Sequence, residues 1–540
     1  MSIRHQFALK TIPALILSAA LVACGDGGTT SSSNSTQPVY TAVFDAGSSG
    51  TRLSFFKVTP GNGGYPIIEL LAKYNDKLLD VPNDDGINDF MNNEGVIELT
   101  KGDALPAGCN PPAGQTGPKY TGLGPNDVAP CVLQPELKKL DAGIADLNAK
   151  NPGLNLTKSQ VLVELFATAG MRTEALYNGG THTQAEIDQF YAGMKNYVAN
   201  WGYNAGQYKT INGNSEEGLW TWINLNDQYF NAFGGNKTYW SSAPTTRGNF
   251  EVGGSSMQIA FPTNQVAVGD DNNVYSVKIN GYTYNVYSKT FLGLGGDDTR
   301  KYMRSYGYQT GSGYNGGTDC FGTSANDTNT SESSGVALFY NAAFFPNSGT
   351  IATNAVNNTW TPTLSKSAFP LKFNASTSGL FNPSTCAAKY NGITTAVMAL
   401  PRNSYGTIPN QSNPASYASF VTAVGKSSAP FVGVDGFYHA SNTLGLVSKT
   451  ALVSTFTQSQ YETAYAALCN SGYQGDSAKG VQSQRGCADA TYMKDFLWRT
   501  GGLFTSNTGA TFEGVAPNND LSGKEALTWT RGYLLRKYAN

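Results

Sequence analysis

The sequence predicts an α/β protein whose chain forms two lobes around a cleft. Runs rich in β-branched and aromatic residues, such as 39–58 and 275–287, are mixed with segments of helical periodicity. The clearest of the helical segments are 137–150, 183–201 and 458–469. Two β-rich regions, 39–58 and 249–261, share one design. They lie about 200 residues apart, so they can face each other across a cleft between lobes.

The shared design is a strand that ends in an acidic residue, then a turn of Gly and Ser, then a second strand. Asp45 ends the first such strand and Glu251 ends the second. Glycines let the backbone turn so that several N–H groups converge on one anion, and serine hydroxyls add donors. The preceding carboxylate can hold a hydrated divalent cation on the same phosphate groups. The turn residues, which we therefore predict to bind phosphate, are Gly47, Ser48, Ser49, Gly50 and Thr51 in the first region and Gly253, Gly254, Ser255 and Ser256 in the second.

The composition indicates a folded protein of low charge. Of 540 residues, 40% are apolar, which is enough for a sizeable core, whereas only 14% are charged. The 36 basic and 38 acidic residues give a net charge of −2, without the basic excess that neutralises nucleic-acid phosphates. We therefore expect no nucleic-acid partner. Only three His are present and one of them, His5, lies in the leader, which excludes a multi-histidine metal site.

The first residues are typical of an exported lipoprotein. The apolar run 11–23 has about thirteen residues, whereas about 20 are needed to cross a membrane, so 1–23 is predicted to be a signal peptide. The run ends in Leu-Val-Ala-Cys, which resembles a bacterial lipobox and predicts a lipid anchor on Cys24. The alternative is a plain secretory signal with an incidental Cys. The Gly/Ser/Thr-rich stretch 24–38 is predicted to be a flexible tether, which indicates a membrane-anchored lipoprotein, either periplasmic or on the cell surface.

Six further cysteines predict disulfides in an oxidising compartment. An even number of cysteines after an export signal is typical of disulfide pairs, and the lack of any Cys-x-x-Cys disfavours a zinc site or a thioredoxin-like motif. Six cysteines allow 15 pairings, of which we favour the sequential one. That pairing joins Cys109 to Cys131, Cys320 to Cys386 and Cys469 to Cys487.

Five short segments resemble, in order, the five apyrase conserved regions of the ecto-nucleoside triphosphate diphosphohydrolases. The segments are DAGSSGT at 45–51, ATAGMR at 167–172, INGNSEEGLWTW at 211–222, EVGGSSMQI at 251–259 and WTRG at 529–532. One motif of this length has little specificity, whereas five in the order of the family identify the chain as a member. The resemblance covers essentially all of the chain after the predicted tether.

The resemblance implies a fold, a reaction and a cofactor. The fold is two RNase H-like, or actin-like, lobes with the active site in the cleft between them. Lobe I would comprise 39–208 plus 520–540, and lobe II would comprise 209–519. The reaction is extracytoplasmic hydrolysis of nucleoside tri- and diphosphates to the monophosphate and phosphate, with a divalent cation, Mg²⁺ or Ca²⁺. The nucleotide substrates and the membrane are the expected partners, and no protein partner is predicted.

The resemblance also implies catalytic roles for individual residues. Glu217 matches the family's base, which activates water for in-line attack on the terminal phosphorus, and its neighbour Glu216 is the rival. Gln258 corresponds to a residue that helps to position the attacking water. Thr168 and Arg172 match residues near the phosphate cleft, although a structural ion pair is an equally good interpretation of Arg172.

Two acidic and two aromatic residues complete the predicted site. Asp45 and Glu251 match the pair of acids that hold the divalent cation, largely through its water molecules. Phe437 and Tyr438 are our candidates for stacking on the nucleobase, because stacking on an aromatic ring tolerates every base. The alternative for both aromatic residues is that they belong to a strand of the core.

The sequence departs from the family pattern in two places. Glu251 replaces the usual Asp and places the carboxylate one methylene farther out. We expect this change to alter the metal geometry or preference, because magnesium demands strict octahedral coordination and calcium is more permissive. One extra residue lies between Gly213 and Glu217, so we expect this loop to bulge. Neither departure removes a charge that the mechanism needs.

Two other functions are compatible with parts of the sequence. One is an exopolyphosphatase-like phosphatase of the same fold, which also uses paired Gly-rich loops, but the ATAGMR segment and the cysteines disfavour it. The other is a non-enzymatic surface lipoprotein that binds nucleotide or carbohydrate, which the low charge and the 30 Tyr would suit. Such a protein would need neither Glu217 nor both phosphate loops.

Overall fold

The computed structural model describes parts of the chain from Gln37 onward, all within the unit Gln37–Asn540. The predicted signal peptide, Cys24 and Ser49 lie outside the described residues, so the roles given to them stay predictions. The described residues are 37–48, 50–60, 66–74, 86–99, 104–175, 181–232, 246–279, 282–305, 320, 381–398, 431–447, 454–470, 486–498, 504, 511–514 and 528–539.

The first sheet has five strands in the order β3-β2-β1-β6-β7. The strands are β1 (Val39–Gly47), β2 (Gly50–Thr59), β3 (Ile67–Tyr74), β6 (Val161–Ala167) and β7 (Asn204–Thr210). β1 pairs antiparallel with β2 and parallel with β6, so a hairpin flanks it on one side and a crossover connection on the other. Successive residues of β1 face opposite sides of the sheet, which places Phe44 in one core cluster and Val43 in another.

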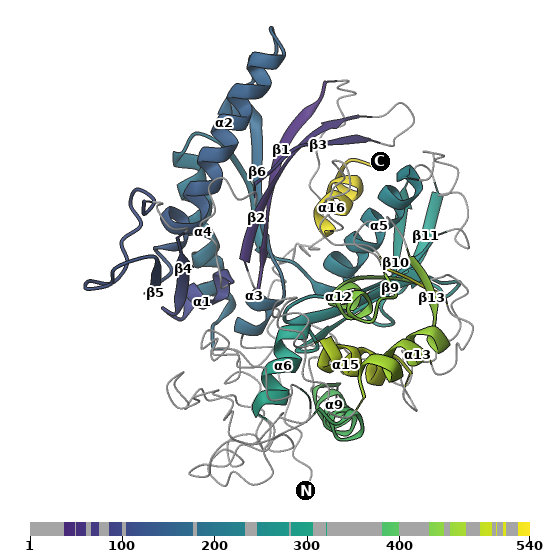
Figure 1. The fold of residues 1–540 in the computed structure, drawn as a ribbon. Coiled ribbons are helices and arrows are strands. Elements are labelled where there is room, and N and C mark those ends of the chain that lie inside the picture. The colour runs from purple at the N-terminus through teal and green to yellow at the C-terminus, as the bar shows by residue number, and fades with distance from the viewer. Residues whose placement is uncertain are drawn as a thin grey trace, which may run out of the picture. The chain divides into compact units, whose positions relative to one another are not determined.

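Two long helices cover the Phe44 side of the first sheet (Figure 1). They are α2 (Gln134–Lys150) and α4 (Gln184–Asn200). In α2 the buried residues Leu137, Leu140 and Ile144 recur at helical spacing and pack into this core cluster. Both helices were predicted from their periodicity, and the structure confirms them.

A small two-stranded ribbon precedes α2. β4 (Gly95–Glu98) follows the short helix α1 (Ile87–Met91) and pairs antiparallel with β5 (Lys119–Leu123). The disulfide Cys109–Cys131 ties the loop between these strands to η1 (Ala129–Leu133), a π-helical turn that leads into α2. A 3₁₀ turn, η2 (Lys158–Gln160), leads into β6.

The second sheet has seven strands in the order β10-β11-β9-β8-β12-β14-β13. The strands are β8 (Gly248–Val252), β9 (Ser256–Pro262), β10 (Val274–Ile279), β11 (Tyr282–Leu292), β12 (Phe431–Asp435), β13 (Ser454–Thr457) and β14 (Thr511–Gly514). β8 repeats the arrangement of β1, because it pairs antiparallel with the next strand, β9, and parallel with β12. The helices that contribute to the core on the outer side of this sheet are α6 (Gly296–Ser305), α9 (Pro383–Met398), α12 (Gly436–Thr443), α13 (Gln458–Leu468) and α15 (Gly486–Trp498).

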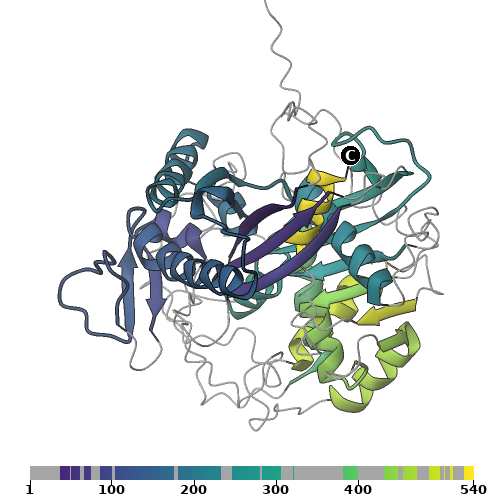
Figure 2. The ribbon, with the colours of Figure 1, turned by 90° about the horizontal axis from the view of Figure 1, so that it is seen from above.

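A helix pair, α5 (Leu219–Ala232) and α16 (Trp529–Tyr538), lies between the two sheets (Figure 1). Its side chains share one core cluster with both sheets, including Val43 of β1 and Ala260 of β9. Figure 2 shows the yellow α16 beside the purple strands that begin the first sheet. The last described helix is therefore a packing partner of the first described strands.

Gly532 lets α16 approach α5 closely. A Cβ atom added to Gly532 would overlap the backbone carbonyl of Trp220 in α5. Arg531 strengthens the contact, because its Nε donates to Asp227 Oδ2 of α5 at 2.7 Å and its Nη1 donates to the Ile68 carbonyl of β3 at 2.9 Å. The glycine of the WTRG segment is thus required by helix packing.

The three disulfides follow the predicted sequential pairing. They join Cys109 to Cys131, Cys320 to Cys386 and Cys469 to Cys487. The predicted helix at 458–469 is confirmed as α13, and the predicted β-rich run at 275–287 lies in β10 and β11. The predicted lobe boundaries stay predictions. Within the described ranges, no helix is both long enough and apolar enough to cross a membrane.

Candidate active site

The structure brings the two predicted phosphate loops into contact. In the first loop, Gly47 of β1 pairs with Gly50 of β2, and Gly50 has a φ of 147°, which favours glycine. In the second loop, the Gly253 N–H donates to the Ser256 carbonyl at 3.0 Å. A Cβ atom added to Gly254 would lie only 2.7 Å from the Ser48 hydroxyl oxygen, so one loop touches the other. Thr51 lies just beyond, in β2 opposite Ala46 of β1.

The second loop is held from behind by the start of α6. The N–H groups of Gly296 and Asp297 donate to the carbonyls of Gly253 and Gly254 at 2.8 and 2.9 Å. The N–H and C=O of one peptide unit point in opposite directions, so the N–H groups of Gly254 and Ser255 point away from α6. They are therefore available to an anion on the other side of the loop. The Ser255 hydroxyl donates to Asp298 Oδ1 of α6 at 3.3 Å.

Glu217 lies in a π-helical turn, η4 (Gly213–Gly218), that leads into α5. The Glu217 N–H donates to the Asn212 carbonyl five residues earlier, at 2.9 Å. Such a turn contains one residue more than an α-helical turn, so it accommodates the extra residue found in the sequence, and the expected bulge is present. The Asn212 side chain caps the turn by accepting from the N–H groups of Asn214 and Ser215.

Arg172 ties Glu217 to the second loop. It lies in α3 (Ala169–Glu174), is 2% exposed, and its Nη2 lies 2.5 Å from Glu217 Oε2. The same nitrogen donates to the Ser256 hydroxyl at 3.1 Å, and Nη1 donates to the Ile211 carbonyl at 3.2 Å. Of the two interpretations of Arg172, the structure contains the ion pair, and its partner is the predicted base itself.

Thr168 connects this group to the first sheet. It is buried directly after β6, and its N–H donates to the Ala46 carbonyl at the end of β1 at 3.1 Å. Its own carbonyl accepts from the Arg172 N–H at 3.2 Å, so it begins the helix that carries Arg172. Thr168 therefore lies between the end of β1 and the Arg172–Glu217 pair.

The rival carboxylate, Glu216, has structural partners. Lys209 Nζ lies 2.5 Å from Glu216 Oε1, and the Asn212 N–H donates to Glu216 Oε2 at 2.7 Å. Both oxygens are thus bound within the turn. This arrangement favours Glu217 over Glu216 as the residue that faces a substrate.

Ser256 and Gln258 extend the group around Glu217. Gln258 is buried in β9, and its Nε2 donates to the Ser256 hydroxyl at 2.5 Å. The Ser256 hydroxyl therefore accepts from both Gln258 and Arg172, and its single proton is left to donate elsewhere. Ser256 was predicted to bind phosphate, and the structure also makes it the link between Arg172 and Gln258.

The two predicted metal-holding acids each accept a hydrogen bond from the helix pair between the sheets. Asp45 Oδ1 accepts from Trp529 Nε1 of α16 at 3.2 Å. Glu251 Oε2 accepts from the Thr221 hydroxyl of α5 at 3.1 Å. In each case the donor is neutral, so the hydrogen bond does not offset the negative charge of the ionised carboxylate.

Carboxylates cluster around Glu251. Burial, together with the negative charges of Glu217, Asp435 and Asp45, raises the pKa of Glu251 well above its ordinary value. No group of three or more His, Cys, Asp or Glu side chains within the described ranges is placed to hold a metal ion by itself. The charge of Asp45 is among the causes that raise the pKa of Glu251, so the two carboxylates predicted to hold a cation lie near each other.

Comparison with known proteins agrees with this geometry. Residues 155–385 match the model of the GDA1/CD39 (nucleoside phosphatase) family. This match spans less than half of the chain.

Two curated relatives match a smaller part of the chain. Ectonucleoside triphosphate diphosphohydrolase 2 of Gallus gallus is 32% identical over 146 residues, which are 26% of this chain and 27% of the relative. Ectonucleoside triphosphate diphosphohydrolase 1 of Bos taurus is 29% identical over 154 residues, which are 27% of this chain and 28% of the relative. The matches thus span less than a third of the length of either relative.

A solved structure supports the fold over a longer range. A nucleoside triphosphate hydrolase from Neospora caninum is similar to this chain, with a TM-score of 0.50 and 16% identity. The similarity covers 93% of each chain. Together with the two mixed sheets, this similarity confirms the predicted fold class of two actin-like lobes.

The predicted nucleobase residues lie in the core of the protein. Phe437 is fully buried in α12, with its ring packed against Phe250, Phe456 and Tyr461. Tyr438 is also buried. The stacking role is therefore wrong for Phe437 in this structure, because protein side chains cover its ring, and for Tyr438 it stays a prediction. Both belong to a helix, whereas the alternative interpretation placed them in a core strand.

Asp435 is a candidate site residue that the sequence interpretation missed. It ends β12, pairs in register with Val252 of β8, and has a φ of 53°, which is unusual for a residue other than glycine. Burial is the main cause that raises its pKa to about 6, and the nearby guanidinium of Arg52 opposes this shift. The sequence did contain a signal, because a β-rich run, an acidic residue and a glycine occur here as they do at Asp45 and Glu251.

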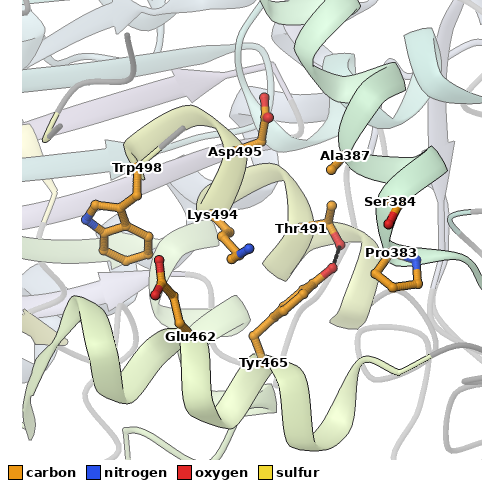
Figure 3. Close-up of a pocket in the computed structure, with 9 residues that line it drawn as sticks. All are labelled: Pro383, Ser384, Ala387, Glu462, Tyr465, Thr491, Lys494, Asp495 and Trp498. Carbon is orange, nitrogen blue, oxygen red and sulfur yellow. Dashed lines mark hydrogen bonds between the residues drawn. The ribbon is translucent and has the colours of Figure 1, made fainter. Parts of the chain in front are cut away.

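A separate hollow of about 270 Å³ lies between α9, α13 and α15 (Figure 3). None of the residues predicted for the active site is among those that line it. The ammonium of Lys494 lies 5.2 Å from the centre of the Tyr465 ring and covers it, while Trp498 is largely buried. The hollow therefore offers charged rim groups rather than an open aromatic surface for a base. Its lining residues are Pro383, Ser384, Ala387, Glu462, Tyr465, Thr491, Lys494, Asp495 and Trp498.

Proposed function

We propose that this protein hydrolyses the terminal phosphoanhydride bond of nucleoside tri- and diphosphates, releasing phosphate and finally the monophosphate. The observation that carries the proposal is the position of Glu217. It is paired with Arg172, which also binds Ser256 of the second Gly/Ser loop, and that loop touches Ser48 of the first. The names of the two curated relatives and the matching family model support a nucleoside phosphate as the substrate.

The two loops would bind the terminal phosphate. The N–H groups of Gly254 and Ser255 face away from α6, and the Ser48 hydroxyl lies beside them. Backbone N–H groups fixed in this way suit an anion, because they need no reorganisation when negative charge moves during the reaction. Ser49, which was predicted to bind phosphate as well, lies outside the described residues.

Glu217 would act as the general base. It accepts a proton from a water molecule while the water oxygen forms a bond to the terminal phosphorus. The bond from that phosphorus to the bridging oxygen breaks, and the bridging oxygen leaves with its electron pair on the shortened nucleotide. Arg172 fixes Oε2 of Glu217, so Oε1 is the oxygen that can take the proton. The Gln258 amide, held by Ser256, would orient the water.

A divalent cation, Mg²⁺ or Ca²⁺, would complete the site. Asp45 and Glu251 would hold it, largely through water, and the ion would neutralise phosphate charge. The raised pKa of Glu251 supports this role. Burial and the neighbouring carboxylates raise it, and no basic side chain is among its causes, so a bound cation would offset negative charge at this place. The finer choice between the two ions would depend on how Glu251 is held.

We also propose that the protein acts outside the cytoplasm, anchored through Cys24. The predicted signal peptide and lipobox support this location, and the three disulfides are typical of an oxidising compartment. Labelling of the full chain with radioactive palmitate in a bacterial host tests the anchor. The wild-type chain should be labelled and Cys24→Ala should not, whereas equal labelling of both would contradict the anchor.

The reaction is tested by phosphate release from ATP and ADP with residues 37–540, in Mg²⁺, Ca²⁺ or EDTA. We expect metal-dependent release from both nucleotides, and we expect Glu217→Ala to abolish turnover while nucleotide still binds. A Glu217→Ala variant with near-normal rates would contradict the assignment of the base. Faster release from polyphosphate than from ATP would instead favour an exopolyphosphatase-like enzyme, and binding without hydrolysis would favour a binding protein.

A further inference from the structure

We propose that Thr221 is a positioning residue for Glu251: its hydroxyl fixes one carboxylate oxygen, so that the other faces the bound cation. The proposal rests on the proposed function, in which Glu251 helps to hold a divalent cation. It explains how the chain tolerates a Glu where the family pattern has an Asp.

The contact joins a helix to a strand. Thr221 lies in the first turn of α5, is 1% exposed, and donates from Oγ1 to Glu251 Oε2 at 3.1 Å. The backbone of Glu251 is fixed on both sides, because Glu251 pairs in register with Gln258 of β9 and with Val434 of β12. Both ends of the hydrogen bond are therefore held by secondary structure, and only the Glu251 side chain between them could move.

A glutamate needs such a restraint more than an aspartate does. Its extra methylene adds one rotatable bond, and ordering a longer side chain costs more conformational entropy. A carboxylate with one oxygen already bound has fewer rotamers to lose when a cation arrives. The Thr221 hydroxyl is also a neutral donor. A Lys or Arg in its place would neutralise the carboxylate, whereas the hydroxyl leaves its negative charge available to attract a cation.

Asp45 provides an independent parallel. One of its oxygens is bound by Trp529 Nε1 of α16, again a neutral donor from the helix pair between the sheets. The two helices are packed closely, because Gly532 of α16 lies against the Trp220 carbonyl of α5. Thr221 follows Trp220 directly, so both acids accept hydrogen bonds from the same closely packed pair of helices, α5 and α16. Glu251 and Asp45 are therefore held in the same way, each by a hydrogen bond from a neutral donor of this helix pair.

The test compares Thr221→Val, which keeps the shape and removes the donor, with Thr221→Ser, which keeps the donor. The readout is the dissociation constant for Mg²⁺ and for Ca²⁺, measured by calorimetry with a non-hydrolysable ATP analogue bound to residues 37–540. We expect Thr221→Val to weaken cation binding roughly 10-fold, in line with other residues that orient metal ligands. Thr221→Ser should stay within about two-fold of the wild type, since its hydroxyl can make the same bond.

A matched control is Thr394→Val. Thr394 is a buried threonine whose hydroxyl donates to the Tyr390 carbonyl at 2.7 Å, and its helix, α9, contributes none of the predicted catalytic, phosphate-binding or metal-holding residues. The same substitution there should leave cation binding unchanged. Melting temperatures without metal report whether each variant is folded, and if Thr221→Val fails to fold, Thr221→Ala serves in its place.

A double-mutant comparison separates positioning from packing. In a Glu251→Asp background the shorter carboxylate no longer reaches Thr221, so adding Thr221→Val should cause no further loss of cation affinity. An equal loss in both backgrounds, or unchanged affinity in Thr221→Val alone, would overturn the proposal. If the wild type itself neither binds the cation nor releases phosphate, the proposed function fails, and that result differs from the other two.

Discussion

The two Gly/Ser hairpins have the same design in the sequence, but different parts of the chain support them. The carboxylate of Asp45, near the end of β1, is bound by Trp529, which follows it by 484 residues. The carboxylate that ends β8 is bound by Thr221, which precedes it by 30 residues. The loop after β8 is held by hydrogen bonds from the start of α6, whereas the loop after β1 packs against Gly86, before α1, and Gly170 of α3.

The difference shows that a phosphate-loop motif does not hold its own acid. In both hairpins the strand and turn place the carboxylate, and a helix from outside the motif donates a hydrogen bond to one of its oxygens. The two helices are α5 and α16, which touch each other through Gly532. A change in this helix contact should therefore affect both hairpins, whereas a change in one donor should affect one.

The largest effect is expected from Gly532→Ala. The added Cβ would collide with the Trp220 carbonyl, a backbone atom that cannot rotate away, so α16 must shift from α5. We expect a loss of about 3 kcal/mol in the free energy of unfolding, at the upper end for overpacking. Urea unfolding of residues 37–540 measures it. Unchanged stability would show that the close packing of α5 and α16 is not a rigid support for the two hairpins.

A loss of about 2–3 kcal/mol with rising pH is expected from Glu174, on the side of the first hairpin. Burial raises its pKa to about 7, against the hydrogen bond from Asn92, and Glu94 adds to the rise. His182 Nε2 lies 3.9 Å from its Oε2. The unfolded chain ionises this group near its ordinary value of 4.5, so stability is greatest below that pH and falls as the pH rises to about 7.

Glu174→Gln should remove this component of the pH dependence. Urea unfolding of the wild type and the variant at pH 5 and pH 8 measures it. The gap between the two proteins should change by about 2–3 kcal/mol between these pH values. Parallel pH curves would mean that Glu174 is not held in its neutral form by burial.

The second sheet buries an ionisable group of the opposite sign, for which we expect about 2 kcal/mol. Lys289 of β11 is 1% exposed, and its ammonium has no hydrogen-bond partner in the described part of the chain. Burial lowers its pKa to about 8. The folded state is therefore penalised below pH 8, and stability is regained as the pH rises from about 8 towards 10.5.

Lys289→Met should therefore stabilise the protein at pH 7 by about 2 kcal/mol, because it removes a buried charge and keeps the length of the side chain. Thermal unfolding at pH 7 and pH 10 measures it, and the gain should be smaller at pH 10. A destabilised variant at pH 7 would indicate that Lys289 has a favourable partner.

The smallest effect is expected from Trp529→Phe, which keeps an aromatic side chain and removes the indole N–H that donates to Asp45. We expect stability to fall by about 1 kcal/mol, the value of one hydrogen bond, and cation affinity to fall through the first hairpin alone. Combined with Thr221→Val, the losses in affinity should add, because the donors serve different acids. A combined loss no larger than either single loss would contradict the separate support of the two hairpins.

Much of the site follows from local patterns, and the rest depends on contacts between distant segments. The hairpins are local, so residue types and spacing were sufficient to predict them. The bulge before Glu217 was expected only from comparison with the family pattern, and the disulfides follow a favoured sequential pairing. The donors to Asp45 and Glu251 were missed, because neither Trp529 nor Thr221 reveals in the sequence which strand its helix packs against. Choosing base-binding rings among 30 Tyr and 26 Phe failed at Phe437, since an aromatic side chain suits a buried helix as well as a binding surface.

The hydrogen bond between Trp529 and Asp45 also sets the order in which the site can be completed during synthesis. A ribosome that adds about 5–20 residues per second needs roughly 25 to 100 seconds to make the 484 residues between them. Through that interval β1 and β2 can already pair, while Asp45 still lacks its partner. A nascent chain therefore carries an unfinished candidate site until translation has passed Trp529, and a prematurely terminated chain never acquires the finished one.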